Sequence, residues 1–148
     1  MHKISKAIID CFERGNKVLI CGNGGSMTQA DHFAEELLGK FEKKRKALPA
    51  ISLSNPSILS AIGNDFGFGN IFSRQVEGLA KEGDILITIS TSGTSVNIMW
   101  ARSVAHVNGI EVIVFPTNKE LGTNTAETQE THLKLIHKIC KEVENHFI

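Results

Sequence analysis

The stretch VLICGNGGS, residues 18–26, decides the fold class of this 148-residue chain. It begins as an apolar run rich in β-formers, which is typical of a buried strand. It continues as the turn Gly22–Ser26, whose glycines permit positive φ angles and a close approach of the backbone to a ligand. Ser26 and Gln29 have the spacing of a capping box, so we expect a helix from Met27 to about Gly39. Strand, glycine-rich turn and helix together indicate an α/β sheet.

The same alternation continues on both sides of this stretch. Strands are predicted at residues 17–21, 49–53, 85–90 and 110–115, and helices at 4–12, after Asn55, at 71–79, 96–107 and 125–145. Residues 64–69 are predicted to be a loop, and 116–124 are a polar stretch. We therefore predict an α/β fold, a three-layer α/β/α sandwich with a parallel sheet, in which residues 1–148 form a single domain.

The composition limits the classes of function. Lys and Arg balance Asp and Glu, which gives a formal net charge of +0 and argues against a nucleic-acid or membrane-surface protein. No apolar run approaches the roughly 20 residues of a membrane helix. The cysteines are Cys11, Cys21 and Cys140, which are scattered and odd in number. We therefore expect a cytoplasmic protein with reduced, buried thiols.

Two loops at strand ends could hold an anion. Ligands of open α/β sheets bind beyond the carboxyl ends of the strands, where Gly22–Ser26 and Ser90–Ser95 both lie. The first loop offers backbone N–H groups, and the second offers five hydroxyls at a helix start. The alternative for the second loop is structural, with Ser95 merely capping the following helix. The two loops together favour a phosphate site.

Nucleotide-binding motifs are absent from the sequence. Met27 stands where a dinucleotide fingerprint needs its third glycine, and no acidic residue follows the second predicted strand. No GxxxxGK[ST] motif is present either, which excludes an NTPase P-loop.

Polar residues on two helices could carry chemistry. His32 and Glu36 are four residues apart, which fits either an exposed surface pair or a metal ligand beside a catalytic carboxylate. On the last helix, Gln129, His132 and His137 lie on or beside the apolar face. Spacing alone does not choose between His132 and His137.

Four motifs carry a resemblance to a known family. They are CGNGGS at 21–26, HFAEEL at 32–37, AIGNDFGF at 61–68 and ISTSG at 89–93. In this order they closely resemble the phosphoheptose (sedoheptulose 7-phosphate) isomerases, which belong to the SIS (sugar isomerase) domain proteins. Members of that family usually begin earlier and have a longer segment where this chain has 116–124. We interpret both differences as residues missing from this sequence rather than as deletions.

The resemblance implies conversion of sedoheptulose 7-phosphate to D-glycero-D-manno-heptose 7-phosphate, the first step towards heptose of bacterial surface polysaccharide. It implies zinc bound by His32, Glu36, Gln129 and His137, with Glu36 and His137 transferring protons through an enediol. It also implies a homotetramer whose active sites use neighbouring subunits. The implied substrate contacts are Asn23, Gly24, Gly25, Glu36, Asn64, Asp65, Ser90, Thr91, Ser92, Ser95 and Gln129.

Two other functions remain as alternatives. A non-catalytic SIS protein of the replication-initiator-associated type would act through protein contacts, but such relatives lack the glutamate found here at Glu36. A sugar-phosphate-sensing module would need the Ser90–Ser95 loop without the zinc set. Such a module is normally attached to a DNA-binding segment, and the sequence shows none.

Overall fold

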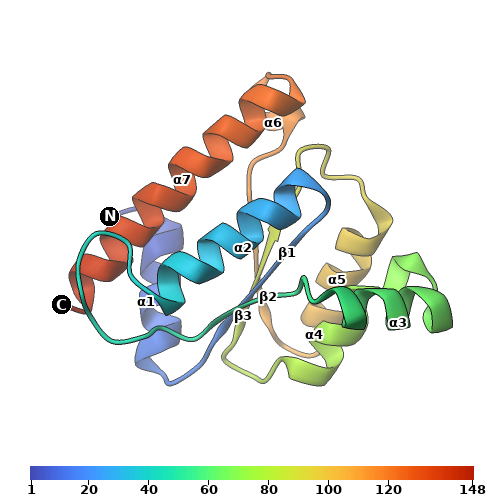
Figure 1. Ribbon diagram of the computed structural model, residues 1–148, viewed down its shortest axis with the longest axis horizontal. Coiled ribbons are helices and arrows are strands. Elements are labelled where there is room, and N and C mark those ends of the chain that lie inside the picture. Colours follow the sequence, from blue (N-terminus) through green and yellow to red (C-terminus); the bar gives the residue numbers. More distant parts are fainter.

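A parallel sheet of four strands, in the order β2-β1-β3-β4, forms the centre of the computed structural model, which describes residues 1–148 (Figure 1). The strands are β1 Val18–Gly22, β2 Ala50–Ser52, β3 Ile85–Ile89 and β4 Glu111–Val114. The helices are α1 Lys3–Glu13, α2 Gly25–Leu38, α3 Pro56–Phe66, α4 Ser73–Leu79, α5 Val96–Val107, α6 Asn118–Leu121 and α7 Thr125–His146, with a 3₁₀ turn at Phe68–Asn70.

Helices cover both faces of the sheet, which confirms the predicted three-layer fold. Alternate residues of a strand point to opposite faces, so β1 contributes to two separate cores. Val18 and Ile20 join a core with α1, α2 and α7, whereas Leu19 and Cys21 join one with α4 and α5. The central strands β1 and β3 are buried along their whole length, as their apolar sequence predicts.

The three cysteines lie in the interior, as the sequence analysis expects. Cys11, Cys21 and Cys140 are free thiols and buried, and burial raises the pKa of Cys11 to about 11. None of the helices combines the length and the hydropathy needed to cross a lipid bilayer.

Two local predictions are wrong, namely the capping box at Ser26 and the loop at residues 64–69. The helix after the first loop begins at Gly25 with Gly24 as its N-cap, and no side chain caps it. Gln29 instead donates a hydrogen bond to the backbone oxygen of Gln129 on α7 (2.8 Å), so a tertiary contact replaces the capping box. Residues 64–66 continue α3 rather than forming a loop, and the polar stretch 116–124 contains the short helix α6, which Thr117 caps.

Helices α2 and α7 lie side by side and run in the same direction (Figure 1). The segment between α2 and β2, residues 39–49, passes the C-terminal part of α7, where Glu144 accepts hydrogen bonds from its backbone. This packing brings residues of the early helix and the last helix together.

Candidate active site

Three ionisable side chains converge between α2 and α7. His32 and Glu36 occupy successive turns of α2, with 3.7 Å between His32 Nε2 and Glu36 Oε1. His137 of α7 faces them, and its ring centroid lies 5.5 Å from that of His32. Each residue offers one ligand atom, and these atoms lie within 4.8 Å of one another. The fold thus brings together three of the four predicted metal ligands.

The surroundings of this cluster shape its chemistry. The Glu36 side chain is only 14% exposed. Burial, reinforced by a hydrogen bond and charge repulsion from Glu35, raises the pKa of Glu36, although His32 opposes the shift. The ring of Phe41 lies 5.4 Å from that of His137 and forms an apolar wall on one side. A carboxylate with a raised pKa is a stronger base than one in water.

The structure separates the two histidines that spacing left unresolved. His132 is fully buried, and its Nε2 lies 2.5 Å from the backbone oxygen of Pro116. Burial lowers the pKa of His132, so its ring is neutral and can donate this hydrogen bond. His132 therefore connects α7 to Pro116, just after β4, and is not part of the cluster that contains His137.

Gln129, the fourth predicted ligand, lies against the glycine loop. A Cβ atom at Gly25 would lie 2.7 Å from Gln129 Nε2, so the absence of a side chain at Gly25 leaves space for the Gln129 amide. Gln129 precedes His137 by eight residues, about 12 Å along the helix. To share a metal with His137, its side chain would have to extend along α7 towards that residue.

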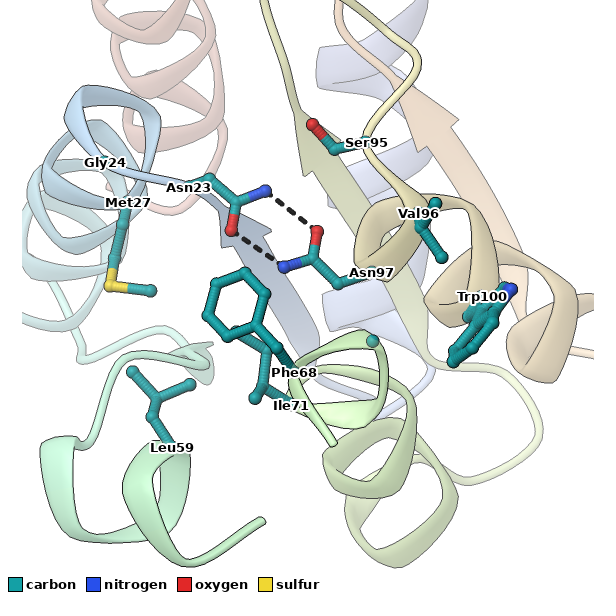
Figure 2. A pocket seen from close by; sticks show the side chains of 11 residues that line it. Asn23, Gly24, Met27, Leu59, Phe68, Ile71, Ser95, Val96, Asn97 and Trp100 are labelled. Carbon is teal, nitrogen blue, oxygen red and sulfur yellow. Dashed lines mark hydrogen bonds between the residues drawn. The ribbon is translucent and has the colours of Figure 1, made fainter. Parts of the chain in front are cut away.

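The two predicted loops meet at a cavity of about 620 Å³ at the carboxyl ends of β1 and β3. Asn23, Gly24 and Ser95 line it, together with Asn97 at the start of α5 and the apolar Phe68 and Trp100 (Figure 2). The amides of Asn23 and Asn97 exchange two hydrogen bonds, of 2.8 and 3.0 Å. This pair holds the loops at a fixed separation.

The hydroxyls of the second loop are engaged within the loop itself. Ser90 Oγ accepts a hydrogen bond from the N–H of Gly93, and Ser92 Oγ accepts one from the N–H of Thr94. Ser95 stands at the N-cap of α5, as the structural alternative expects, but its side chain accepts no capping hydrogen bond. Its hydroxyl is free to contact a ligand. The backbone carbonyl of Thr91 accepts a hydrogen bond from the N–H of Asn118 (2.7 Å), which connects the loop to the start of α6.

The predicted substrate contacts Asn64 and Asp65 lie apart from this cavity. Both are exposed at the end of α3, where the amide of Asn64 donates to the carboxylate of Asp65 (3.0 Å). Neither residue lines the cavity beside Asn23 and Ser95. Within one chain, the fold does not bring them to the remaining candidate residues.

The sequence analysis missed two residues of this site. Asn97 is buried and depends on a partner 74 positions away, so no local pattern marks it. Phe41 follows Gly39 and Lys40 in a segment with no helical or strand periodicity. Its position against His137 becomes visible only when α2 and α7 are packed together.

Comparisons with known proteins place the chain in a family. The SIS domain family model matches residues 1–116. A phosphoheptose isomerase of Escherichia coli (strain K12 / DH10B) is 42% identical over 166 aligned residues, which cover 100% of this chain and 86% of the relative.

Two solved structures are similar in both fold and sequence. The phosphoheptose isomerase of Francisella tularensis superimposes with a TM-score of 0.87 at 38% identity, and that of Neisseria gonorrhoeae with 0.85 at 36%. Each match covers 96% of this chain and 83% of the other. The chain therefore belongs to the SIS domain family and, within it, to the phosphoheptose isomerase enzymes.

Proposed function

We propose that residues 1–148 form one domain that converts sedoheptulose 7-phosphate to D-glycero-D-manno-heptose 7-phosphate, for bacterial surface polysaccharide. The convergence of His32, Glu36 and His137 between two helices carries this proposal, because it joins a basic carboxylate to two imidazoles. The relatives named above support the choice of substrate.

The residues of the cluster fit zinc. Two imidazole nitrogens and a carboxylate oxygen are the donors that zinc prefers, and atoms within 4.8 Å of one another can share one ion. We propose Gln129 as the fourth ligand, because it precedes His137 on the same helix, α7. When bound, zinc supplies a Lewis acid that polarises the substrate oxygens.

The side chains of the cluster would carry the proton transfers. Isomerisation of a ketose to an aldose moves a proton from C1 to C2 through an enediol. Glu36 is suited to remove and return the carbon-bound proton, since burial strengthens it as a base. His137, facing Glu36 from the other helix, is placed to donate a proton to the substrate oxygen and to accept one back.

We assign the phosphate to the Ser90–Ser95 loop. The loop combines backbone N–H groups, hydroxyls and the N-terminus of the 12-residue helix α5, which together favour an anion without any lysine. Asn23, Gly24 and Gly25 would contact the sugar from the opposite loop, which leads into the helix that carries His32. His32 lies seven residues beyond Gly25, about 10 Å along α2.

We further propose that the active unit is a homotetramer. Asn64 and Asp65 lie outside the cavity of their own chain, so a neighbouring subunit would have to supply them. Large apolar side chains are exposed near the same surface, with Phe66 at 51% and Phe68 at 70%. Such a patch favours burial against another protein surface.

One assay tests the reaction. Purified protein is incubated with sedoheptulose 7-phosphate in deuterated buffer, and the products are followed by NMR. We expect an aldoheptose 7-phosphate that carries solvent deuterium at C2, loss of turnover on chelation, and recovery on addition of zinc. A protein that binds the sugar phosphate without converting it would instead support the non-catalytic alternative. Light scattering of the active sample should give four times the chain mass, and a fully active monomer would contradict the tetramer.

A further inference from the structure

The segment between α2 and β2 is irregular in backbone but tightly anchored. Glu144 of α7 accepts three consecutive backbone N–H groups of this segment, from Phe41 (2.9 Å), Glu42 (2.7 Å) and Lys43 (2.9 Å). Its side chain is 2% exposed. Burial alone would raise the pKa of Glu144, but the three N–H donors and the nearby Arg45 outweigh it and lower the pKa. Glu144 is therefore ionised and fully engaged.

Arg45 anchors the same segment to the end of α2. Its guanidinium donates hydrogen bonds to four backbone carbonyls, those of Glu36 (2.6 Å), Leu37 (2.9 Å), Gly39 (2.7 Å) and Lys46 (3.2 Å). Two of these carbonyls belong to the last turn of α2, where they lack partners within the helix. The Arg45 side chain is 1% exposed, and its Nε lies 3.4 Å from Glu144 Oε1.

This ion pair joins the two helices that carry the metal cluster. Arg45 binds the backbone of Glu36 itself, and Glu144 follows His137 on α7 by seven residues, or about two turns. Between the two anchors, Phe41 donates its N–H to Glu144 and places its ring 5.4 Å from that of His137. A buried ion pair needs hydrogen bonds for its other polar groups. Here both carboxylate oxygens of Glu144 and both terminal nitrogens of Arg45 have them, while Arg45 Nε makes only the 3.4 Å ionic contact with Glu144.

We infer that Arg45 and Glu144 are positioning residues for the cluster of His32, Glu36 and His137. They fix the end of α2 against α7, and through Phe41 they hold the imidazole of His137 in place. They touch neither substrate nor metal. This inference rests on the proposed function, since it takes the cluster to be the metal site. Partners of this kind that orient metal ligands typically affect metal affinity by 10- to 100-fold.

The chain offers a matched control at the amino end of the central strand β3. Asp84, just before β3, is also a buried carboxylate that accepts two backbone N–H groups, from Lys17 (3.0 Å) and Lys81 (2.7 Å). It also pairs with a cation, Lys17 Nζ, at 2.6 Å. Asp84→Asn should therefore destabilise the fold much as Glu144→Gln does, without reaching the cluster.

The test compares zinc affinity and stability in these two variants. Zinc dissociation constants are measured by competition with a chromophoric chelator, and unfolding by urea with circular dichroism. We expect Glu144→Gln to weaken zinc binding about 10- to 100-fold and Asp84→Asn to leave it unchanged. Glu144→Gln should also lower kcat more than it raises KM. Equal zinc affinity in the two variants would overturn the inference.

Two further variants keep the outcome decisive. Phe41→Leu leaves the ion pair intact and removes only the ring beside His137, so it should fold normally and bind zinc more weakly than the wild type. If Glu144→Gln does not fold, unchanged zinc affinity in Phe41→Leu overturns the inference. His137→Ala separates the two claims: if it binds zinc like the wild type, the proposed metal site itself fails. If His137→Ala loses zinc while Glu144→Gln and Phe41→Leu keep it, only the inference fails.

Discussion

The cluster of His32, Glu36 and His137 and the two loops, Gly22–Ser26 and Ser90–Ser95, are built in different ways. The cluster consists of side chains on two long helices, and a buried ion pair fixes the spacing of these helices. The loops consist largely of backbone and short hydroxyl side chains, which satisfy one another locally, as Ser90 and Gly93 do. Substitutions in the cluster should therefore affect chemistry and metal, whereas substitutions in the loops should affect substrate affinity.

The largest effect is expected at Glu36. Glu36→Gln keeps the size of the side chain and an oxygen ligand but removes its ability to take a proton. Loss of a general base typically lowers the rate by about 10²–10⁴-fold. Steady-state kinetics should show this loss in kcat with little change in KM, and exchange of the substrate's α-proton with deuterated solvent should stop. Near-normal turnover would restrict Glu36 to the role of a ligand.

Substitution of His132 and His137 on α7 should separate metal binding from stability. His137→Ala should lose zinc in an elemental analysis, while His132→Ala should retain it. His132→Ala should instead lower the free energy of unfolding by about 1–3 kcal/mol, because the partly buried hydrogen bond to the carbonyl oxygen of Pro116 is lost. The reverse pattern would place the metal near His132 and would exclude the cluster described above.

A smaller effect, confined to binding, is expected in the loops. The double variant Ser92→Ala with Ser95→Ala should raise KM more than tenfold at nearly constant kcat, because hydrogen bonds to a charged group contribute about 1.5–3 kcal/mol each. Ser103→Ala is a suitable control, since this exposed hydroxyl of α5 bonds only the carbonyl of Met99. An unchanged KM in the double variant would remove the loop from the phosphate site.

The smallest effect concerns acid stability. The pKa values of Asp84 and Glu144 are both lowered in the folded state, because backbone N–H groups and a cation outweigh burial. Each carboxylate therefore stabilises the fold above its unfolded pKa, about 3.9 for Asp and 4.3 for Glu, and this contribution is lost as the pH falls through the folded pKa. Asp84→Asn and Glu144→Gln should each flatten the decline of unfolding free energy below about pH 4, by at most about 1.4 kcal/mol per pH unit. Urea titrations between pH 3 and 7 measure the slope, and an unchanged slope would contradict the assigned pKa directions.

The sequence by itself determined the layers of the fold and the position of the loops. The apolar run of β3 and the glycine-rich turn Gly22–Ser26 are local signals. A buried strand requires apolar residues at its own positions, and a tight turn requires glycine or other turn-forming residues at its own positions. The predicted capping box at Ser26 is wrong, because a local pattern does not fix which partner a side chain bonds in the folded protein. A side chain that can cap a helix can equally reach a neighbouring helix, and the tertiary contact of Gln29 with α7 prevailed.

Only the tertiary structure decided which polar residues act together. His132 and His137 are equivalent by helical spacing, but α7 packs so that one is buried under Pro116 and the other faces His32. Asn97 meets Asn23, and Arg45 meets Glu144, across long stretches of chain. Helical and strand periodicity reports which face of an element is buried, but not which residue of another element it meets there. That choice depends on how the helices pack against the sheet and against each other.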